Sequence, residues 1–233
     1  DLPHSPTRGG NAPRRLMPSI AIIAPPCSRT GACPLPLTLA LPPASPRDGV
    51  GGIGGTDAQV FDTLHMMRAI VHDAAAWTPP PDVASVLRPY DRGHQQAESV
   101  VVHDAYRLGT LVTFRADPPD AEALIHPWRL ILDGPGRMDG DCDDRAMLMC
   151  AFMLANGLPA DRCGFVVMSR QKAGNFEHVF AWAWPAGMGI VPLDPQEKTP
   201  LGEWTPPLPT GGRVWLMDLN GSIRSLDSGA PRV

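Results

Sequence analysis

Residues 145–155 limit the possible folds more than any other part of the sequence. As a helix, this run would be apolar on nearly every face. It lies between a strong helix start and a strong helix stop. Asp141 is a natural N-cap, and Gly157 is a natural residue to follow the last turn, with Pro159 just beyond it. A helix without a polar face must be buried. The pattern therefore predicts a central buried helix whose first turn carries Cys142.

Strand patterns follow this helix. Residues 164–169, 178–184 and 190–193 are short and apolar, and the second run alternates so that aromatic residues share a face with His178. Residues 214–218 and 222–226 flank an Asn-Gly pair that is typical of a hairpin turn. Short connections between successive strands favour antiparallel pairing. The second half of the chain thus predicts an antiparallel sheet beside the buried helix.

The region before the buried helix is mostly helical in pattern. Residues 56–77 show apolar positions at helical spacing, with Thr56 as N-cap, and consecutive prolines after Thr78 end the run. A short helical piece is predicted at residues 82–87 and a second long helix at residues 94–108. A strand is predicted at residues 111–114. The fold class predicted from the whole pattern is α+β.

The first 55 residues differ from the rest, because they hold 11 of the 28 prolines and end in a glycine-rich stretch. Such a composition does not build a core of its own. We therefore divide the chain into an extended arm, residues 1–55, and one domain, residues 56–233. We expect the arm to bind a protein partner, such as a neighbouring subunit of a larger assembly.

Composition limits the other possibilities. The formal net charge is −4, which gives no electrostatic reason to expect nucleic-acid binding. The sequence has no apolar run long enough to cross a membrane, so no membrane partner is expected. Five cysteines without regular spacing argue against a disulfide framework and against zinc, although Cys27 and Cys33 are close enough to pair. Mostly reduced thiols suggest a cytoplasmic protein.

Three residues carry the predicted chemistry. A thiol becomes nucleophilic when it ionises, and the positive end of a helix together with an imidazolium stabilises the thiolate. Cys142 has the helix end. His178 at the start of one predicted strand and Asp194 after the next would lie side by side in an antiparallel pair. They would supply the base and the acceptor that orients it.

These residues also carry a family resemblance. Gly140-Asp141-Cys142-Asp143-Asp144, then His178-Val179-Phe180, then Pro192-Leu193-Asp194-Pro195 resemble the transglutaminase-like superfamily of papain-type thiol proteins. The similarity covers about residues 110–197. The upstream run that includes Phe114, Asp117-Pro118, Glu122 and Pro127 is similar to small microbial and phage-encoded members.

The resemblance implies a papain-like core in which the helix that carries the cysteine packs on the sheet. It implies Cys142 as nucleophile, His178 as general base and acid, and Asp194 as the residue that orients the imidazole. The expected function is acyl chemistry on a peptide or other amide substrate, as a cysteine peptidase, amidase or transglutaminase-like acyltransferase. No cofactor and no metal are implied. The backbone N–H of Cys142 is one expected oxyanion donor.

Some alternatives stay open. The second oxyanion donor is not identified by the sequence, and Trp128, Gln95 and Gln96 are candidates by residue type only. A protein that keeps this fold as a scaffold, for instance a phage virion or tail component, is the rival function. It would place the protein in a virion instead of the cytoplasm.

The acidic residues beside the thiol are a further open point. Asp139, Asp141, Asp143 and Asp144 disfavour a thiolate, so we expect some of them to cap the helix or to pair with Arg137 or Arg145. A calcium loop is the rival reading of these acidic residues, but the EF-hand pattern of glycine and glutamate is not matched.

Overall fold

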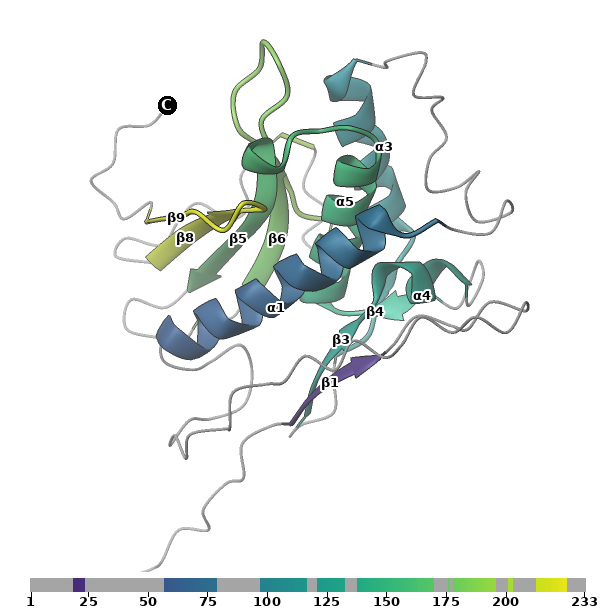
Figure 1. The fold of residues 1–233 in the computed structure, drawn as a ribbon, viewed down its shortest axis with the longest axis vertical. Helices are drawn as coiled ribbons and strands as arrows, with labels where there is room; N and C mark the ends of the chain where they lie inside the picture. The colour runs from purple at the N-terminus through teal and green to yellow at the C-terminus, as the bar shows by residue number, and fades with distance from the viewer. Residues whose placement is uncertain are drawn as a thin grey trace, which may run out of the picture.

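The computed structural model describes residues 19–23, 57–78, 97–116, 121–132, 138–169, 176, 178–195, 201–202 and 213–225. The fold is α+β, as predicted, with a group of helices beside an antiparallel sheet (Figure 1). The sheet has five strands in the order β7-β6-β5-β8-β9. This arrangement agrees with the transglutaminase-like core expected from the sequence, in which the helix that begins at Cys142 packs on an antiparallel sheet.

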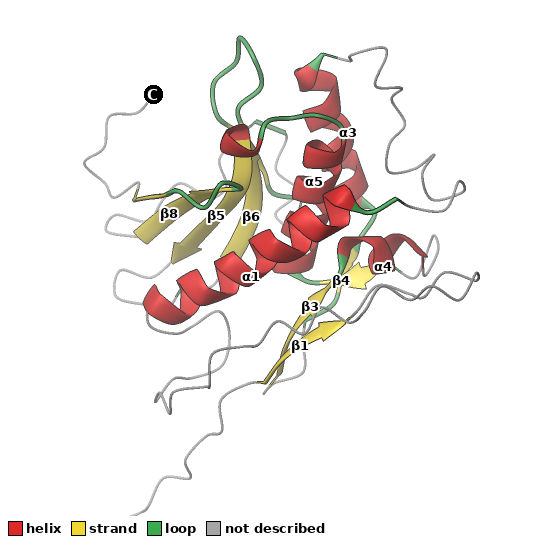
Figure 2. Ribbon diagram, in the orientation of Figure 1, coloured by secondary structure: helices red, strands yellow, loops and turns green. Residues whose placement is uncertain are grey.

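The helix α5 (Cys142–Ala155) lies at the centre of the domain. The helices α1 (Asp57–Ala76), α3 (Glu98–Thr110) and α4 (Pro127–Leu132) pack against it, and its remaining side faces strands β5 and β6 (Figures 1 and 2). All but one of the residues from 143 to 155 are buried. The predicted central helix is therefore confirmed, and its lack of a polar face follows from being enclosed on every side.

Both ends of α5 are built from the residues that the sequence marks. A capping box links Asp141 and Asp144 at the start, and the backbone N–H of Asp141 donates to Oδ2 of Asp144 at 3.4 Å. At the other end, Gly157 has φ +92°. The backbone N–H of Gly157 donates to the carbonyl oxygen of Leu154, and the N–H of Leu158 donates to the carbonyl oxygen of Met153. These two bonds form the Schellman motif. The start of the helix, and with it Cys142, is therefore fixed in place.

The sheet consists of β5 (Cys163–Ser169), β6 (His178–Ala183), β7 (Val191–Leu193), β8 (Arg213–Asp218) and β9 (Ile223–Ser225). All neighbouring strands are antiparallel, and β8 and β9 form the predicted hairpin, in which Gly221 has φ +96°. Gly164 lets β8 approach closely, because a Cβ there would lie 2.0 Å from the carbonyl oxygen of Met217.

Alternate residues of β6 pack on different sides of the sheet. Val179 and Ala181 belong to the main core with α5. Phe180 and Trp182 belong to a second apolar cluster with residues of β5 and β8. Every residue of β5 and β6 is buried, so the sheet has no solvated face along these two strands.

Several predicted boundaries differ from the structure. The second long helix begins at Glu98, after the extended residue Ala97, instead of at residue 94. The strand predicted at residues 111–114 is shorter, β2 (Thr113–Phe114), because Leu111 still has helical dihedrals as the cap of α3. Helix caps and two-residue strands have weak sequence signals, so such shifts are expected.

Some elements were not predicted at all: β3 (Ala121–Ile125), α4, β4 (Asp139–Gly140) and the short 3-10 helix η1 (Ala160–Arg162). The strand β4 exists through its parallel pairing with β2, which lies more than twenty residues earlier in the chain. In the same way, β3 pairs in parallel with β1 (Ser19–Ile23), the one part of the arm that the structure describes. A strand defined by a distant partner leaves little trace in local periodicity.

Other predictions lie outside the described residues. They include the helical piece at residues 82–87, the rest of the arm with its expected partner, and Cys27 and Cys33. Among the described helices, none has the length and apolar character that a membrane span requires.

Candidate active site

Cys142 is the first residue of α5, and the residue is half-buried. The preceding Asp141 has extended dihedrals (φ −100°, ψ −153°), so the chain turns sharply into the helix at this point. A thiol in the first turn lies at the positive end of the helix dipole, which favours a negative charge on sulfur. This position matches the sequence prediction.

His178, the first residue of β6, forms a hydrogen bond with Asp194, the residue that follows the edge strand β7. Nε2 of His178 and Oδ2 of Asp194 are 2.7 Å apart, and both side chains are buried. The pairing of Ala181 with Leu193 explains this contact. Asp194 follows Leu193, so it falls opposite Phe180 and is a diagonal neighbour of His178. The centroid of the His178 ring also lies 5.5 Å from that of the Phe180 ring.

The three predicted residues line one pocket. The pocket that Cys142, His178 and Asp194 line is small and partly open. The other residues of its wall come from α5, from β6 and from the end of β7: Arg145, Met149, Val179, Phe180 and Pro195. Side chains that lie 36 and 16 residues apart in sequence thus meet at the start of α5.

The acidic residues around Cys142 have separate roles. Asp144 is buried and accepts two backbone N–H groups, from Ile125 at 2.7 Å and from Asp141 at 3.4 Å. It therefore joins β3 to the start of α5. Asp139 pairs with Arg115, with 3.4 Å between Oδ2 and Nη1. The expected capping role is confirmed, whereas Arg145 does not form the expected ion pair.

Asp143 is fully buried, and burial raises its pKa well above the usual value of 3.8. A hydrogen bond to Asp141 and the charges of Asp144, Asp141 and Cys142 act in the same direction. One oxygen of Asp143 accepts the N–H of Asp144 at 2.8 Å. The other oxygen, and Oδ1 of Asp141, have no donor among the described residues. A proton on Asp143 explains how both of these oxygens are satisfied, because it forms the hydrogen bond between the carboxyl groups of Asp143 and Asp141.

Asp141, Asp143 and Asp144 are also the described residues whose ligand atoms gather within 4.8 Å of one another. Carboxylate oxygens suit hard cations. However, both oxygens of Asp144 already accept backbone N–H groups, and Asp143 has no exposed surface. The hydrogen bonding of this cluster is that of a helix cap.

Arg145 is the site residue whose role the sequence did not predict. It lies one turn after Cys142, is 8 % exposed and lines the same pocket. Nη2 donates to the carbonyl oxygen of Val112 at 2.6 Å, and the guanidinium lies over the Phe114 ring at 5.7 Å. Burial lowers the pKa of Arg145, while the charges of Asp194, Cys142 and Asp141 act to raise it. The sequence signal that could have identified Arg145 was its spacing of three residues from Cys142, which places the two on one face of the helix.

Trp128 was a candidate for the second oxyanion donor, and the structure contradicts this. Its side chain is fully buried, and its Nε1 donates to the carbonyl oxygen of Ala74 at 2.6 Å. The indole N–H is therefore committed to joining α4 to α1. The other two candidates, Gln95 and Gln96, lie outside the described residues.

The other described thiols, Cys150 and Cys163, are core residues. Burial raises the pKa of Cys150 well above its usual value of 9.0 and that of Cys163 to about 12. Each thiol is directed at a backbone carbonyl oxygen, that of Gly164 and that of Pro159 respectively. Neither thiol has the surroundings of a nucleophile.

The fold was compared with known proteins. LapG of Legionella pneumophila, in its calcium-bound form, superposes with a TM-score of 0.46 and 15 % identity over 71 % of this chain and 93 % of LapG. The EGTA-treated form of LapG gives a TM-score of 0.44 and 15 % identity over 69 % of this chain and 90 % of LapG. A candidate protease from Parabacteroides distasonis has a TM-score of 0.46 and 11 % identity, and the match covers 74 % of this chain and 32 % of that protease. No family model and no curated protein sequence matches this chain.

Proposed function

We propose that the protein is a cysteine-dependent enzyme that acts on an amide bond, with Cys142, His178 and Asp194 as its catalytic triad. The observation that carries this proposal is the 2.7 Å hydrogen bond between His178 and Asp194 in the wall of the pocket that also holds the Cys142 thiol. A nucleophile, a base and an acceptor that orients the base are the three parts that thiol acyl transfer requires.

The hydrogen bond supports one ring nitrogen as the base in this proposal. An ionised carboxylate can only accept, so Nε2 of His178 must carry the proton that Asp194 receives. Nδ1 is then the nitrogen that takes the proton from the Cys142 thiol. The burial of Asp194 keeps water from competing for this contact.

The reaction proceeds in two stages. The Cys142 thiolate attacks the amide carbonyl carbon, and Nδ1 of His178 gives its proton to the departing amine as the C–N bond breaks. A thioester at Cys142 results. Water or a second amine then attacks the thioester, gives its proton to His178 and releases the thiolate. The choice between water and amine decides between peptidase or amidase activity and acyl transfer.

Part of the oxyanion stabilisation is assigned to the start of α5. The first turn of a helix directs backbone N–H groups outward, so the N–H of Cys142 is suitably placed for the negative oxygen of the tetrahedral intermediate. Removal of one such donor typically costs about 10²- to 10³-fold in rate.

The test is activity against a proteome-derived peptide library, with products identified by mass spectrometry and hydroxylamine added in a parallel reaction. New peptide ends indicate hydrolysis, and hydroxamates or deamidated glutamines indicate transfer or amidase chemistry. We expect Cys142→Ala to lose at least about 10³-fold of this activity. Cys150→Ala, the same change on the same helix, should retain it.

Two results would contradict the proposal. One is equal activity in wild type and Cys142→Ala. The other is a folded wild-type protein that modifies no peptide in the library, which would favour the scaffold function instead.

A further inference from the structure

Arg145 is a buried cation beside the thiol. It is 8 % exposed, lies three residues after Cys142 on the same face of α5, and shares the pocket wall with Cys142, His178 and Asp194. An arginine side chain stays protonated in proteins. Burying such a charge is costly unless a counter-charge and hydrogen bonds compensate it.

The described part of the chain compensates Arg145 only in part. Nη2 has one acceptor, the carbonyl oxygen of Val112, and Phe114 supplies a ring face. Nε is enclosed and has no acceptor in the part of the chain that the structure describes. Among the described residues no carboxylate forms an ion pair with Arg145. Of the two carboxylates whose charges act on it, Asp194 and Asp141, the first is already paired with His178.

An anion in the pocket would supply the counter-charge that the described residues do not give Arg145. A carboxylate accepts two parallel hydrogen bonds from a guanidinium, which is the strongest pairing that Arg forms. A dianionic phosphate fits less well, because Asp141 and Asp194 lie near enough to act on the Arg145 charge and would repel two charges more than one.

We infer that Arg145 forms a carboxylate-binding subsite beside Cys142, and that the preferred substrate carries a carboxylate next to the amide that is attacked. This inference rests on the proposed function, because it describes the substrate of the same thiol. Residues three apart on a helix have Cβ atoms about 5–6 Å apart. The carboxylate therefore belongs to the residue at the attacked bond or to its immediate neighbour, as an acidic side chain or a chain end.

The test uses two alkylating reagents that differ only in the group to be recognised. Iodoacetate carries a carboxylate and iodoacetamide an uncharged amide, and both alkylate sulfur through their methylene carbon with loss of iodide. Rates are measured on the Cys142 peptide by mass spectrometry. The iodoacetate-to-iodoacetamide ratio cancels the intrinsic reactivity of the thiol, so it reports recognition of the carboxylate.

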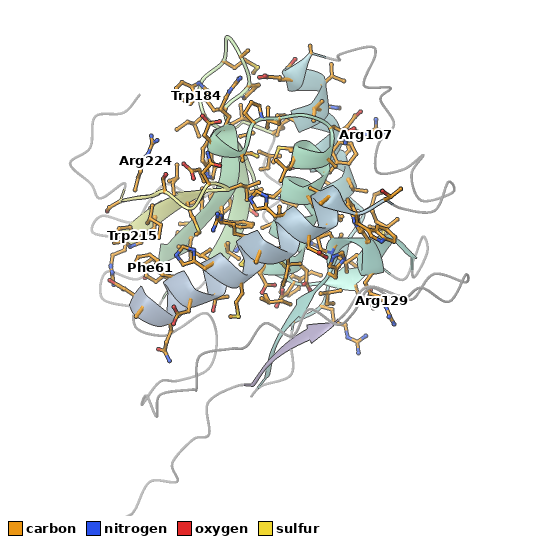
Figure 3. The ribbon with its side chains drawn as sticks, in the orientation of Figure 1. Phe61, Arg107, Arg129, Trp184, Trp215 and Arg224 are labelled. Atoms are coloured by element: carbon orange, nitrogen blue, oxygen red, sulfur yellow. The ribbon has the colours of Figure 1, made fainter. Side chains whose placement is uncertain are left out.

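We expect Arg145→Gln to lower this ratio about tenfold relative to wild type, and Arg145→Lys to lower it less, because lysine keeps the charge without the fork. Any attraction by His178 is the same in each protein. The matched control is Arg224→Gln, an equal loss of charge at an exposed position on the far edge strand β9, which should leave the ratio within about twofold (Figure 3).

If Arg145→Gln does not fold, wild type alone gives the answer. Acetate should protect Cys142 from iodoacetamide while acetamide does not, and equal effects of the two would overturn the subsite. A second outcome is that Cys142 reacts with an iodoacetate-to-iodoacetamide ratio that is the same in wild type and in Arg145→Gln. That result also overturns the subsite but leaves the proposed function standing. A ratio that depends on Arg145 in a protein without amide activity supports the subsite and contradicts the function. A thiol inert to both reagents overturns both.

Discussion

Nε2 of His178 lies 2.7 Å from Oδ2 of Asp194, and each residue has only about 3 % of its surface exposed. This pair fixes the orientation of the imidazole ring, because the carboxylate can only accept a hydrogen bond. The ring nitrogen that remains available for proton transfer is Nδ1. The hydrogen bond therefore connects a feature of the sheet, the register of β6 and β7, to the chemistry expected at the start of α5.

Substitutions at Asp194 test this orienting role. Asp194→Ala removes the acceptor, and we expect kcat to fall by about 10²- to 10⁴-fold. Asp194→Asn keeps an amide oxygen that can still accept from Nε2, so its loss should be about tenfold smaller. The measurement is kcat on a peptide identified from the library. Equal losses in the two variants would show that the hydrogen bond does not orient the ring.

Asp143 should make stability depend on pH. Because its pKa is raised in the folded state, the folded protein keeps a proton above pH 3.8 that the unfolded chain releases. Unfolding then releases a proton, so a rise in pH from about 4 toward the raised pKa lowers the free energy of unfolding, by at most about 1.4 kcal/mol per pH unit.

Asp143→Asn provides the comparison, since an amide can donate to Asp141 without titrating. Its free energy of unfolding, measured by urea denaturation, should gain on that of wild type as the pH rises from about 4 to about 7. Asp143→Leu cannot donate and should be destabilised at every pH. A difference between Asp143→Asn and wild type that does not change with pH would show that Asp143 is ionised in the folded protein.

Gly140 should tolerate no side chain. A Cβ at this position would lie 2.9 Å from both Cβ and Oδ2 of Asp144, so Gly140→Ala must displace the carboxylate that holds Asp141 and Ile125. We expect a loss of about 1–3 kcal/mol of stability and slower alkylation of Cys142. Gly189→Ala is the control, because a Cβ there has no neighbour within 4 Å. Wild-type stability in Gly140→Ala would show that the cap adapts at little cost.

The sequence predicted the parts of the site that lie at the ends of strongly marked elements. Cys142 follows an N-cap and opens an apolar run, and His178 and Asp194 lie at the ends of strands that pair through short connections. Local signals were sufficient to place these three residues in their elements, whereas their catalytic roles came from the family resemblance and stay a prediction. The central helix, the antiparallel sheet and its final hairpin were predictable for the same reason.

The rest depended on contacts between distant segments. Asp144 is held by Ile125, in a strand that the sequence did not predict, and Arg145 is held by a carbonyl oxygen in the connection after α3. Trp128 was suggested as an oxyanion donor by residue type, but its N–H is used by α1. Which partner satisfies a polar group is decided by packing, and periodicity carries no information about that.

The claim on which the whole account depends is that Cys142 is an activated thiol. The most direct measurement is the rate of iodoacetamide labelling at neutral pH, followed for each cysteine by peptide mapping of the folded protein. We predict that Cys142 reacts at least about 10²-fold faster than Cys150 and Cys163, since burial keeps those two thiols protonated. The rate at Cys142 should also fall sharply in His178→Gln. Slow labelling of Cys142, equal to that of the two core thiols, would contradict the account.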